Sequence, residues 1–316
     1  MSRLRPPRLR TLARQYLAHR RACGYRMQTE EYVLRDFTRY AERTAPGRPI
    51  TTALALQWIA QRSGLRAVTR ANRLDTLRAF ARFCHPFDPR TEIPPTGLSS
   101  RVCRRRAPYI VTAAEVRLIM RRAGKVRANG STLRPQTLQA LIGLIACTGL
   151  RINEALRLRC EDLDLHSGTL HVARAKFSPE RDLPLHPSTL RALDRYRRLR
   201  QRHYPNGAHL FIGPHGRPMQ GCAASWTLRH LVHDFPPRGD RPRPRFHDLR
   251  HSLATHLIAR WSQEGAPIAH RLLLLSRYLG HKHFHNTYWY IEPHRAALQA
   301  AATRFERFHS TTKEDT

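Results

Sequence analysis

Residues 148–156 read TGLRINEAL, a stretch that places Arg151 at the beginning of a predicted helix. The residues before it, about 133–147, form an apolar run that predicts a buried helix. An arginine at the beginning of a helix is usually a surface residue, so this stretch alone does not define a site. Its meaning depends on the segments that follow it.

The region after this stretch carries the clearest β signal in the chain. Residues 162–187, DLDLHSGTLHVARAKFSPERDLPLHP, alternate apolar and polar residues between turn residues, which predicts three short antiparallel strands. Lys176 stands near the start of the last turn, AKFSPE. After Ser188 the pattern is helical again, except for the loop PPRGDRPRPR at 236–245. This half of the chain is therefore predicted to be mainly α-helical with a small antiparallel β-sheet.

Toward the N-terminus, residues 8–85 repeat apolar residues at three- and four-residue steps in four segments, which predicts a small all-helical domain. Thr29 and Thr52 are candidate N-caps. Residues 86–110 contain five prolines and the basic run RVCRRR, a composition typical of an interdomain linker. A capping box, TAAE at 112–115, then opens a new helix. We therefore expect a helical domain at 1–88, a linker at 89–110 and a second domain at 111–316.

The charge of the chain points to a polyanionic partner. The 316 residues include 56 Lys and Arg against 23 Asp and Glu, a formal net charge of +33. A codon bias explains why arginine is used far more often than lysine, but it does not explain the shortage of acidic residues. A compact body with this excess would repel itself, so nucleic acid is the natural partner.

Cysteine spacing and hydropathy restrict the compartment. The six cysteines form no CxxC pair and show no disulfide-like or zinc-like spacing, which is typical of core thiols in a reducing compartment. No apolar run approaches the roughly 20 residues that span a bilayer, and no signal peptide opens the chain. We expect a cytoplasmic, nucleoid-associated protein that neither spans a membrane nor binds a metal or cofactor.

Two further motifs combine with Arg151 and Lys176 to suggest chemistry. HDLRH places His247 and Arg250 three residues apart on one helical face. LGHKHFHNTYWYI, at 279–291, places His281 nine residues before Tyr290. Each motif is weak alone, because such residues are usually solvated or buried in a core. Together they supply what metal-free phosphoryl transfer needs: guanidinium groups for the phosphate oxygens, a lysine acid and a phenol nucleophile.

The motifs TGLRINEAL, HDLRHSLATH and LGH followed nine residues later by tyrosine resemble the tyrosine recombinase (phage integrase) family. The order of arginine, hairpin lysine, His-x-x-Arg, histidine and tyrosine in that family is reproduced from Arg151 to Tyr290. The helical N-terminal region also resembles the core-binding domain of the family. The resemblance covers most of the chain, although the specific motifs lie in the second domain.

The resemblance implies a role for each residue. Arg151 and Arg250 would hold the scissile phosphate, with His281 as a further donor. Lys176 would be the general acid for the leaving 5′-oxygen, and His247 would assist proton transfer with the phenol. Tyr290 would be the nucleophile, and Tyr288 and Trp289 neighbours of it. Glu154 would hold the Arg151 region, while His283 and His285 are expected at the surface rather than as metal ligands.

The chain departs from the family pattern in two places. The 31 residues from Arg250 to His281 make a longer segment than in the compact chromosome-dimer-resolving recombinases, and with TYWYIEP they resemble recombinases of transposons. The hairpin reads ARAKFSPERDLPL where many relatives have a glycine-flanked lysine. The role of Lys176 therefore rests on less than the roles of the arginines.

The resemblance implies a site-specific recombinase that cleaves and rejoins double-stranded DNA through a 3′-phosphotyrosine, for integration or transposition of a mobile element. It further implies a homo-tetramer on DNA, with or without sister recombinases. A C-terminal helix at about 294–309 would dock on a neighbouring or on its own subunit. The alternatives are a type IB topoisomerase-like enzyme and an accessory DNA-binding protein without independent activity.

Overall fold

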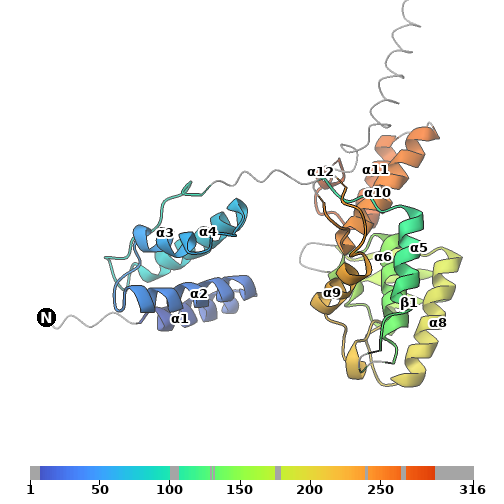
Figure 1. Ribbon diagram of the computed structural model, residues 1–316, viewed down its shortest axis with the longest axis horizontal. Coiled ribbons are helices and arrows are strands. Elements are labelled where there is room, and N and C mark those ends of the chain that lie inside the picture. Colours follow the sequence, from blue (N-terminus) through green and yellow to red (C-terminus); the bar gives the residue numbers. More distant parts are fainter. Residues whose placement is uncertain are drawn as a thin grey trace, which may run out of the picture. The chain divides into compact units, whose positions relative to one another are not determined.

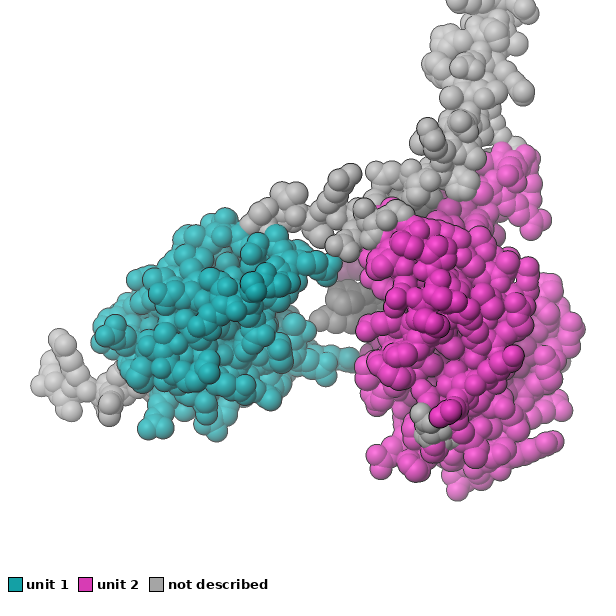
Figure 2. All heavy atoms as spheres, viewed as in Figure 1, with its two compact units in different colours: residues 1–105 teal, residues 106–316 magenta. Residues whose placement is uncertain are grey.

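The structure is a computed structural model that describes residues 8–99, 107–128, 130, 132–174, 179–238, 241–264 and 268–288. Contacts within the chain separate two compact units, residues 1–105 and 106–316 (Figures 1 and 2). Lys176, Tyr290 and the predicted C-terminal helix lie outside the described residues.

The first unit is a small helical domain. Its helices are α1 (Leu9–Ala22), α2 (Gln28–Thr44), α3 (Thr52–Ala60) and α4 (Ala67–Cys84). Apolar residues at helical spacing turn inward, so that Leu34, Phe37, Leu77 and Phe80 have no solvent exposure. Most arginines of the same helices lie on the outer faces, as the periodicity predicts, whereas Arg73 and Arg78 of α4 are buried.

Two predicted N-caps in this unit are wrong. Thr29 lies inside α2, whose N-cap is Met27 in the left-handed conformation. Helix α3 is capped by Thr51, whose side chain accepts a hydrogen bond from the Leu54 amide at 3.1 Å. The neighbouring threonine, Thr52, instead donates its backbone N–H to Glu92 at 2.8 Å. Glu92 comes from far along the chain, so local sequence could not choose between the two threonines.

The stretch predicted to be a linker is hydrogen-bonded at both ends. In the first unit Arg78 donates to the carbonyl oxygens of Pro94 and Pro95, each at 2.6 Å. In the second unit Arg241 donates to the Ala107 carbonyl oxygen at 3.2 Å. The described ends of residues 89–110 are therefore fixed to the unit on their own side.

The second unit packs its helices around a large apolar core, with a smaller apolar cluster formed by α10 and α11. Its helices are α5 (Ala113–Ala123), α6 (Arg134–Thr148), α7 (Ile152–Ala155), α8 (Pro187–His203), α9 (Gly221–Leu231), α10 (Phe246–Gln263), α11 (Ile268–Leu279) and α12 (His285–Tyr288). The predicted capping box opens α5, with Thr112 and Glu115 bonded reciprocally. Helix α6 is nearly all apolar and lies at the centre, in contact with α5, α8 and α10. This central helix ends at the TGLR stretch.

The predicted sheet has three antiparallel strands in the order β1–β2–β3. The strands are β1 (Leu163–Asp164), β2 (Thr169–Val172) and β3 (Arg181–Pro184). Val172 pairs with Arg181, so residues 173–180 connect β2 to β3. The prediction of a mainly α-helical fold with a small antiparallel sheet is confirmed.

The expectation that the cysteines are core thiols is largely wrong. Of the five cysteines that the structure describes, Cys84 is buried, whereas Cys23, Cys147 and Cys222 are exposed and Cys160 is intermediate. All five are free thiols. Within the described parts of the chain, no helix is both long and apolar enough to cross a bilayer.

Candidate active site

The end of helix α11 is the centre of the candidate site. Gly280 adopts a left-handed conformation with φ of 68°. The amide of His281 bonds back to the Ser276 carbonyl at 3.0 Å, and the Gly280 amide to the Arg277 carbonyl at 2.9 Å. This pair of bonds is a Schellman motif, which satisfies two of the carbonyls at a helix end. The next carbonyls, from Tyr278 on, need other donors.

Three arginines donate to the three consecutive carbonyls that follow. Arg181 Nε donates to Tyr278 at 2.8 Å. An Arg250 nitrogen donates to Leu279 at 2.9 Å, and one of Arg151 to Gly280 at 3.2 Å. The carboxyl end of a helix carries partial negative charge, which favours guanidinium groups there. Arginines distant in sequence thus converge on one helix end, next to His281.

Gly149 allows Arg151 to approach this helix end. Its φ of 66° ends α6 in the left-handed conformation, and Arg151 follows as the N-cap of α7. A Cβ atom at position 149 would lie 2.7 Å from a methyl carbon of Leu279. Glycine is therefore required here by both backbone conformation and space. The TGLR stretch turns the chain against the end of α11.

Glu154 joins two of the three arginines. Its carboxylate accepts from Arg151 at 2.8 Å and from Arg181 at 3.0 Å, and also from the Arg151 amide at 3.1 Å. Burial alone would raise the pKa of Glu154, but Arg181 and Arg151 outweigh it and hold the pKa at about 2. Glu154 is therefore an anion that fixes the Arg151 region, the contact predicted for it.

Helix α10 presents His247 and Arg250 to the site on successive turns. Arg250 is only 1% exposed and also donates to the Gly149 carbonyl at 2.8 Å, so it links α6 to α11. His247 is exposed, and its ring packs edge-on against the ring of His251 at a centroid distance of 4.5 Å. The protein atoms packed around the ring nevertheless displace part of its hydration. This effect, followed by the charge of Arg250, lowers the pKa of His247 to about 4.

A hydrogen bond to Thr287 of α12 holds the ring of His281 in place. Its Nδ1 lies 2.8 Å from the hydroxyl of Thr287, which is fully buried in α12. Burial, followed by the charges of Arg250, Arg151 and Arg181, lowers the pKa of His281 to about 3. The histidine is therefore neutral at physiological pH, beside a concentration of positive charge that favours an anionic ligand.

The structure thus brings together four of the six predicted site residues: Arg151, His247, Arg250 and His281. The other two, Lys176 and Tyr290, lie outside the described residues. His283 and His285 are exposed, as expected. Among the described residues, no group of three or more His, Cys, Asp or Glu side chains is arranged to hold a metal ion.

Sequence analysis missed Arg181, the third guanidinium of the cluster. The signal was the two-residue period of strand β3, which puts Arg181 on the same face as the fully buried Leu183. An arginine on the inward face of a strand needs acceptors within the protein. That requirement alone could have singled it out.

Comparison with known proteins identifies the family. Residues 110–296, more than half of the chain, match the model of the phage integrase family. The chain belongs to this family of tyrosine recombinases. It is 33% identical over 305 residues to a protein of Sinorhizobium fredii (strain NBRC 101917 / NGR234) named integrase/recombinase y4rB, covering 94% of this chain and 97% of that protein.

Other similar proteins extend the comparison. Over 203 residues this tyrosine recombinase is 27% identical to tyrosine recombinase XerD of Rhizobium meliloti (strain 1021), covering 62% of this chain and 63% of that protein. The fold resembles a lambda integrase dimer bound to a COC′ core site, with a TM-score of 0.65 and 18% identity over 90% of this chain and 77% of that one. It also resembles the Tn1549 transposon integrase in complex with transposon right end DNA, with a TM-score of 0.63 and 18% identity over 96% of this chain and 100% of that one.

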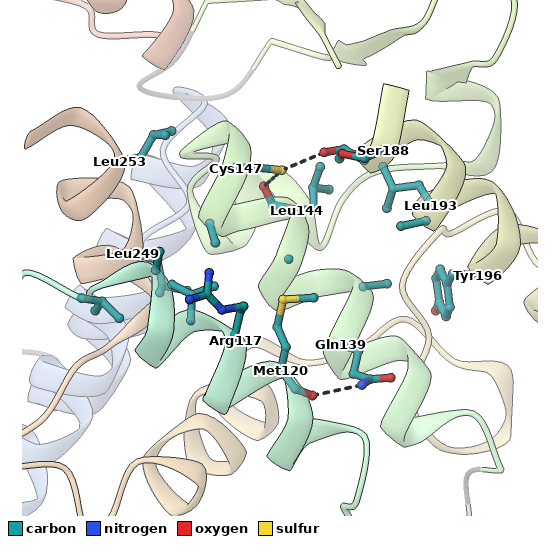
Figure 3. Close-up of a pocket in the computed structure, with 18 of the residues that line it drawn as sticks. Arg117, Met120, Gln139, Leu144, Cys147, Ser188, Leu193, Tyr196, Leu249 and Leu253 are labelled. Carbon is teal, nitrogen blue, oxygen red and sulfur yellow. Dashed lines mark hydrogen bonds between the residues drawn. The ribbon is translucent and has the colours of Figure 1, made fainter. Parts of the chain in front are cut away.

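A separate groove lies on the second unit of this tyrosine recombinase. It has a volume of about 910 Å³ and is lined by residues of α5, α6, α8 and α10 (Figure 3). Its walls are mainly apolar, from Met120 and Leu144 to Leu249, and Gln139 bonds to the Met120 carbonyl at 3.0 Å. None of the four clustered site residues lines it. The groove is therefore an apolar surface distinct from the cationic cluster.

The lowered pKa values of the half-buried His251 and His281 predict how stability depends on pH. The pKa of His251, like that of His281, is lowered to about 3, mainly by burial. The unfolded chain binds protons below its ordinary pKa of about 6.5, whereas the folded chain does not, so stability falls as pH decreases from about 6.5 toward 3. We expect His251→Gln to lessen the loss of unfolding free energy between pH 7.5 and 4.5 by about 1 kcal/mol or more.

Urea unfolding of the full chain at the two pH values measures this difference, followed through the transition of the second unit. The exposed His203, which lies on the surface of α8, gives the matched control variant His203→Gln. An equal pH dependence in wild type and His251→Gln would contradict a depressed pKa at His251.

Proposed function

We propose that this tyrosine recombinase cleaves and rejoins duplex DNA at specific sites through a 3′-phosphotyrosine intermediate formed by Tyr290. The observation that carries the proposal is the convergence of Arg151, Arg250 and His281 on the end of α11. A phosphodiester under in-line attack accumulates negative charge on its non-bridging oxygens. A cluster of fixed cationic donors stabilises that charge without reorganisation during the reaction.

The two arginines differ in their access to DNA. The Arg151 side chain is 30% exposed, whereas Arg250 is 1% exposed. Arg151 is therefore the first guanidinium that an approaching phosphate meets. Contact between Arg250 and the phosphate requires a rearrangement of the site when DNA binds.

Proton transfer is assigned to the remaining residues. Tyr290 attacks the phosphorus, and its phenol, with an ordinary pKa near 10, must lose a proton in doing so. His247, which is neutral in the free protein because its pKa is lowered to about 4, takes part in that transfer. Lys176 protonates the leaving 5′-oxygen. In the second step the 5′-hydroxyl of a partner strand attacks the phosphotyrosine, releases Tyr290 and rejoins the DNA.

Lys176 provides a prediction that separates acid catalysis from simple electrostatics. It is one of four lysines in a chain that otherwise uses arginine. Arginine, with a pKa above 12, is a poor proton donor, so Lys176→Arg should bind DNA normally and cleave about a hundredfold more slowly. On a substrate with a 5′-bridging phosphorothiolate the sulfur leaves without protonation, and most of the defect should disappear. Equal slowing on oxygen and sulfur substrates would show that Lys176 only positions the phosphate.

The partners follow from charge and from the similar proteins. A formal charge of +33 provides the electrostatic attraction to DNA. We assign the protein to integration or transposition of a mobile element, acting as a homo-tetramer on two DNA sites with or without sister recombinases. The helix predicted at residues 294–309, HRAALQAAATRFERFH, would carry an apolar stripe suited to docking on a neighbouring subunit. We assign the apolar groove between α5, α6, α8 and α10 as the surface that receives this segment, from the same or from a neighbouring subunit.

Covalent trapping on nicked suicide DNA tests the proposal. The enzyme should form a denaturation-resistant protein–DNA adduct, because loss of the short strand that carries the 5′-hydroxyl prevents religation. A mixture of two recombination sites should then yield recombinant products through a Holliday junction. Relaxation of supercoils without exchange between sites would indicate a topoisomerase activity, and binding without an adduct would indicate an accessory DNA-binding protein.

A further inference from the structure

Arg181 is the member of the cluster to which no role has been assigned. It is the first residue of β3, and its side chain is only 9% exposed. Its neighbour two residues on, Leu183, belongs to the core of the second unit. A charged group in this position costs free energy unless its donors are satisfied. The buried guanidinium of Arg181 therefore needs acceptors within the protein, and the acceptors that it binds indicate its role.

The guanidinium of Arg181 connects three separate segments. Its backbone belongs to the sheet, where it pairs with Val172. One nitrogen donates to Glu154 at 3.0 Å, the residue that also holds Arg151. Another donates to the Tyr278 carbonyl at 2.8 Å, three residues before His281. Arg181 thus contacts both Glu154, the partner of Arg151, and the helix end that precedes His281.

We infer that Arg181 is a positioning residue of the reaction, whose two hydrogen bonds set Arg151 and His281 at the spacing with which they bind the scissile phosphate. The inference rests on the proposed function, since it assigns that phosphate to the cluster. The hydrogen bonds of Arg181 to Glu154 and to the Tyr278 carbonyl give it an indirect route to the phosphate, through Glu154 and through the end of α11.

The physical reason lies in what each acceptor loses without Arg181. The buried Glu154 carboxylate would keep Arg151 as its remaining described partner, and would draw Arg151 away from an incoming phosphate. The Tyr278 carbonyl would lose its donor at a helix end, where carbonyls have no partner within the helix. Both changes move donors by fractions of an ångström, and displacements on that scale are enough to slow catalysis strongly.

The test compares five variants of the full chain. Arg181→Gln removes the charge, and Arg181→Lys keeps the charge but replaces the two-pronged donor by a single ammonium group. Arg174→Gln is the matched control, since Arg174 is an exposed arginine at the other end of the same hairpin connection. Glu154→Gln, alone and combined with Arg181→Gln, completes a double-mutant cycle.

Both Arg181 variants should form the covalent adduct about tenfold or more slowly than wild type, with DNA affinity within a factor of about three. Arg174→Gln should cleave at the wild-type rate. The double variant should be slowed by clearly less than the product of the two single defects, because the two residues share one contact. Wild-type cleavage by Arg181→Lys would overturn the inference, since charge alone would suffice, and so would multiplication of the two single defects in the double variant.

A second measurement needs no DNA and separates this inference from the proposed function. In the free chain, Arg181→Gln should shift the amide resonances of Gly280 and His281 and the ring resonances of His281, whereas Arg174→Gln should leave them in place. Unchanged resonances in Arg181→Gln would overturn the positioning role. A wild-type protein that forms no adduct would instead refute the proposed function, while the spectra would still decide the role of Arg181.

Discussion

Tyr290→Phe is expected to abolish covalent attachment to DNA while leaving DNA binding nearly intact. The phenol oxygen is the atom that would form the bond to phosphorus, and phenylalanine lacks it. The aromatic ring keeps its size and apolar character, so packing around it changes little. The measurement is the yield of denaturation-resistant adduct on nicked suicide DNA, with binding followed in parallel by a mobility shift.

The neighbouring tyrosine supplies the control for this assignment. Tyr288 is the last residue of α12, directly after Thr287 and two residues before Tyr290. Tyr288→Phe removes an equivalent oxygen from the same short segment and should retain adduct formation. If Tyr288→Phe lost the adduct and Tyr290→Phe kept it, the nucleophile would be Tyr288 and the nine-residue spacing from His281 would have misled.

Arg250→Ala should lower the cleavage rate by about a hundredfold or more, the scale on which loss of a fixed donor to a developing anion acts. It should also lower stability, because Arg250 is 1% exposed and donates to two carbonyls, of Gly149 and Leu279. Two buried carbonyls left without that donor would cost about 3 kcal/mol of unfolding free energy. Adduct formation and urea unfolding measure the two effects separately.

Arg151→Ala is the comparison that separates chemistry from stability. Its side chain is 30% exposed and donates to a single carbonyl in addition to Glu154. We expect a comparable loss of cleavage with a smaller loss of unfolding free energy than in Arg250→Ala. Cleavage by Arg250→Ala near the wild-type rate would remove Arg250 from the phosphate-binding site and leave it a purely structural residue.

Local sequence patterns predicted the structure correctly where the interacting residues are close together in the sequence. The capping box at Thr112 and Glu115 joins residues three apart, and it forms as predicted. The alternation in residues 162–187 predicted the three antiparallel strands, because side chains of a strand alternate between its two faces. Thr51 shows the limit of such reasoning: Glu92, which lies 40 residues after Thr52, occupies the Thr52 amide.

The sequence by itself predicted the chemistry, through the identity and order of Arg151, His247, Arg250 and His281 and the spacing to Tyr290. Only the tertiary structure decided how those groups meet. The bonds from Arg151 and Arg181 to the end of α11 span 129 and 97 residues. Helix and strand periods report only a few residues around each position, whereas carbonyls at a helix end accept whichever donors the fold brings to them. The two-residue period of β3 places Arg181 on the inward face of the strand, but only the tertiary structure shows which acceptors bind it.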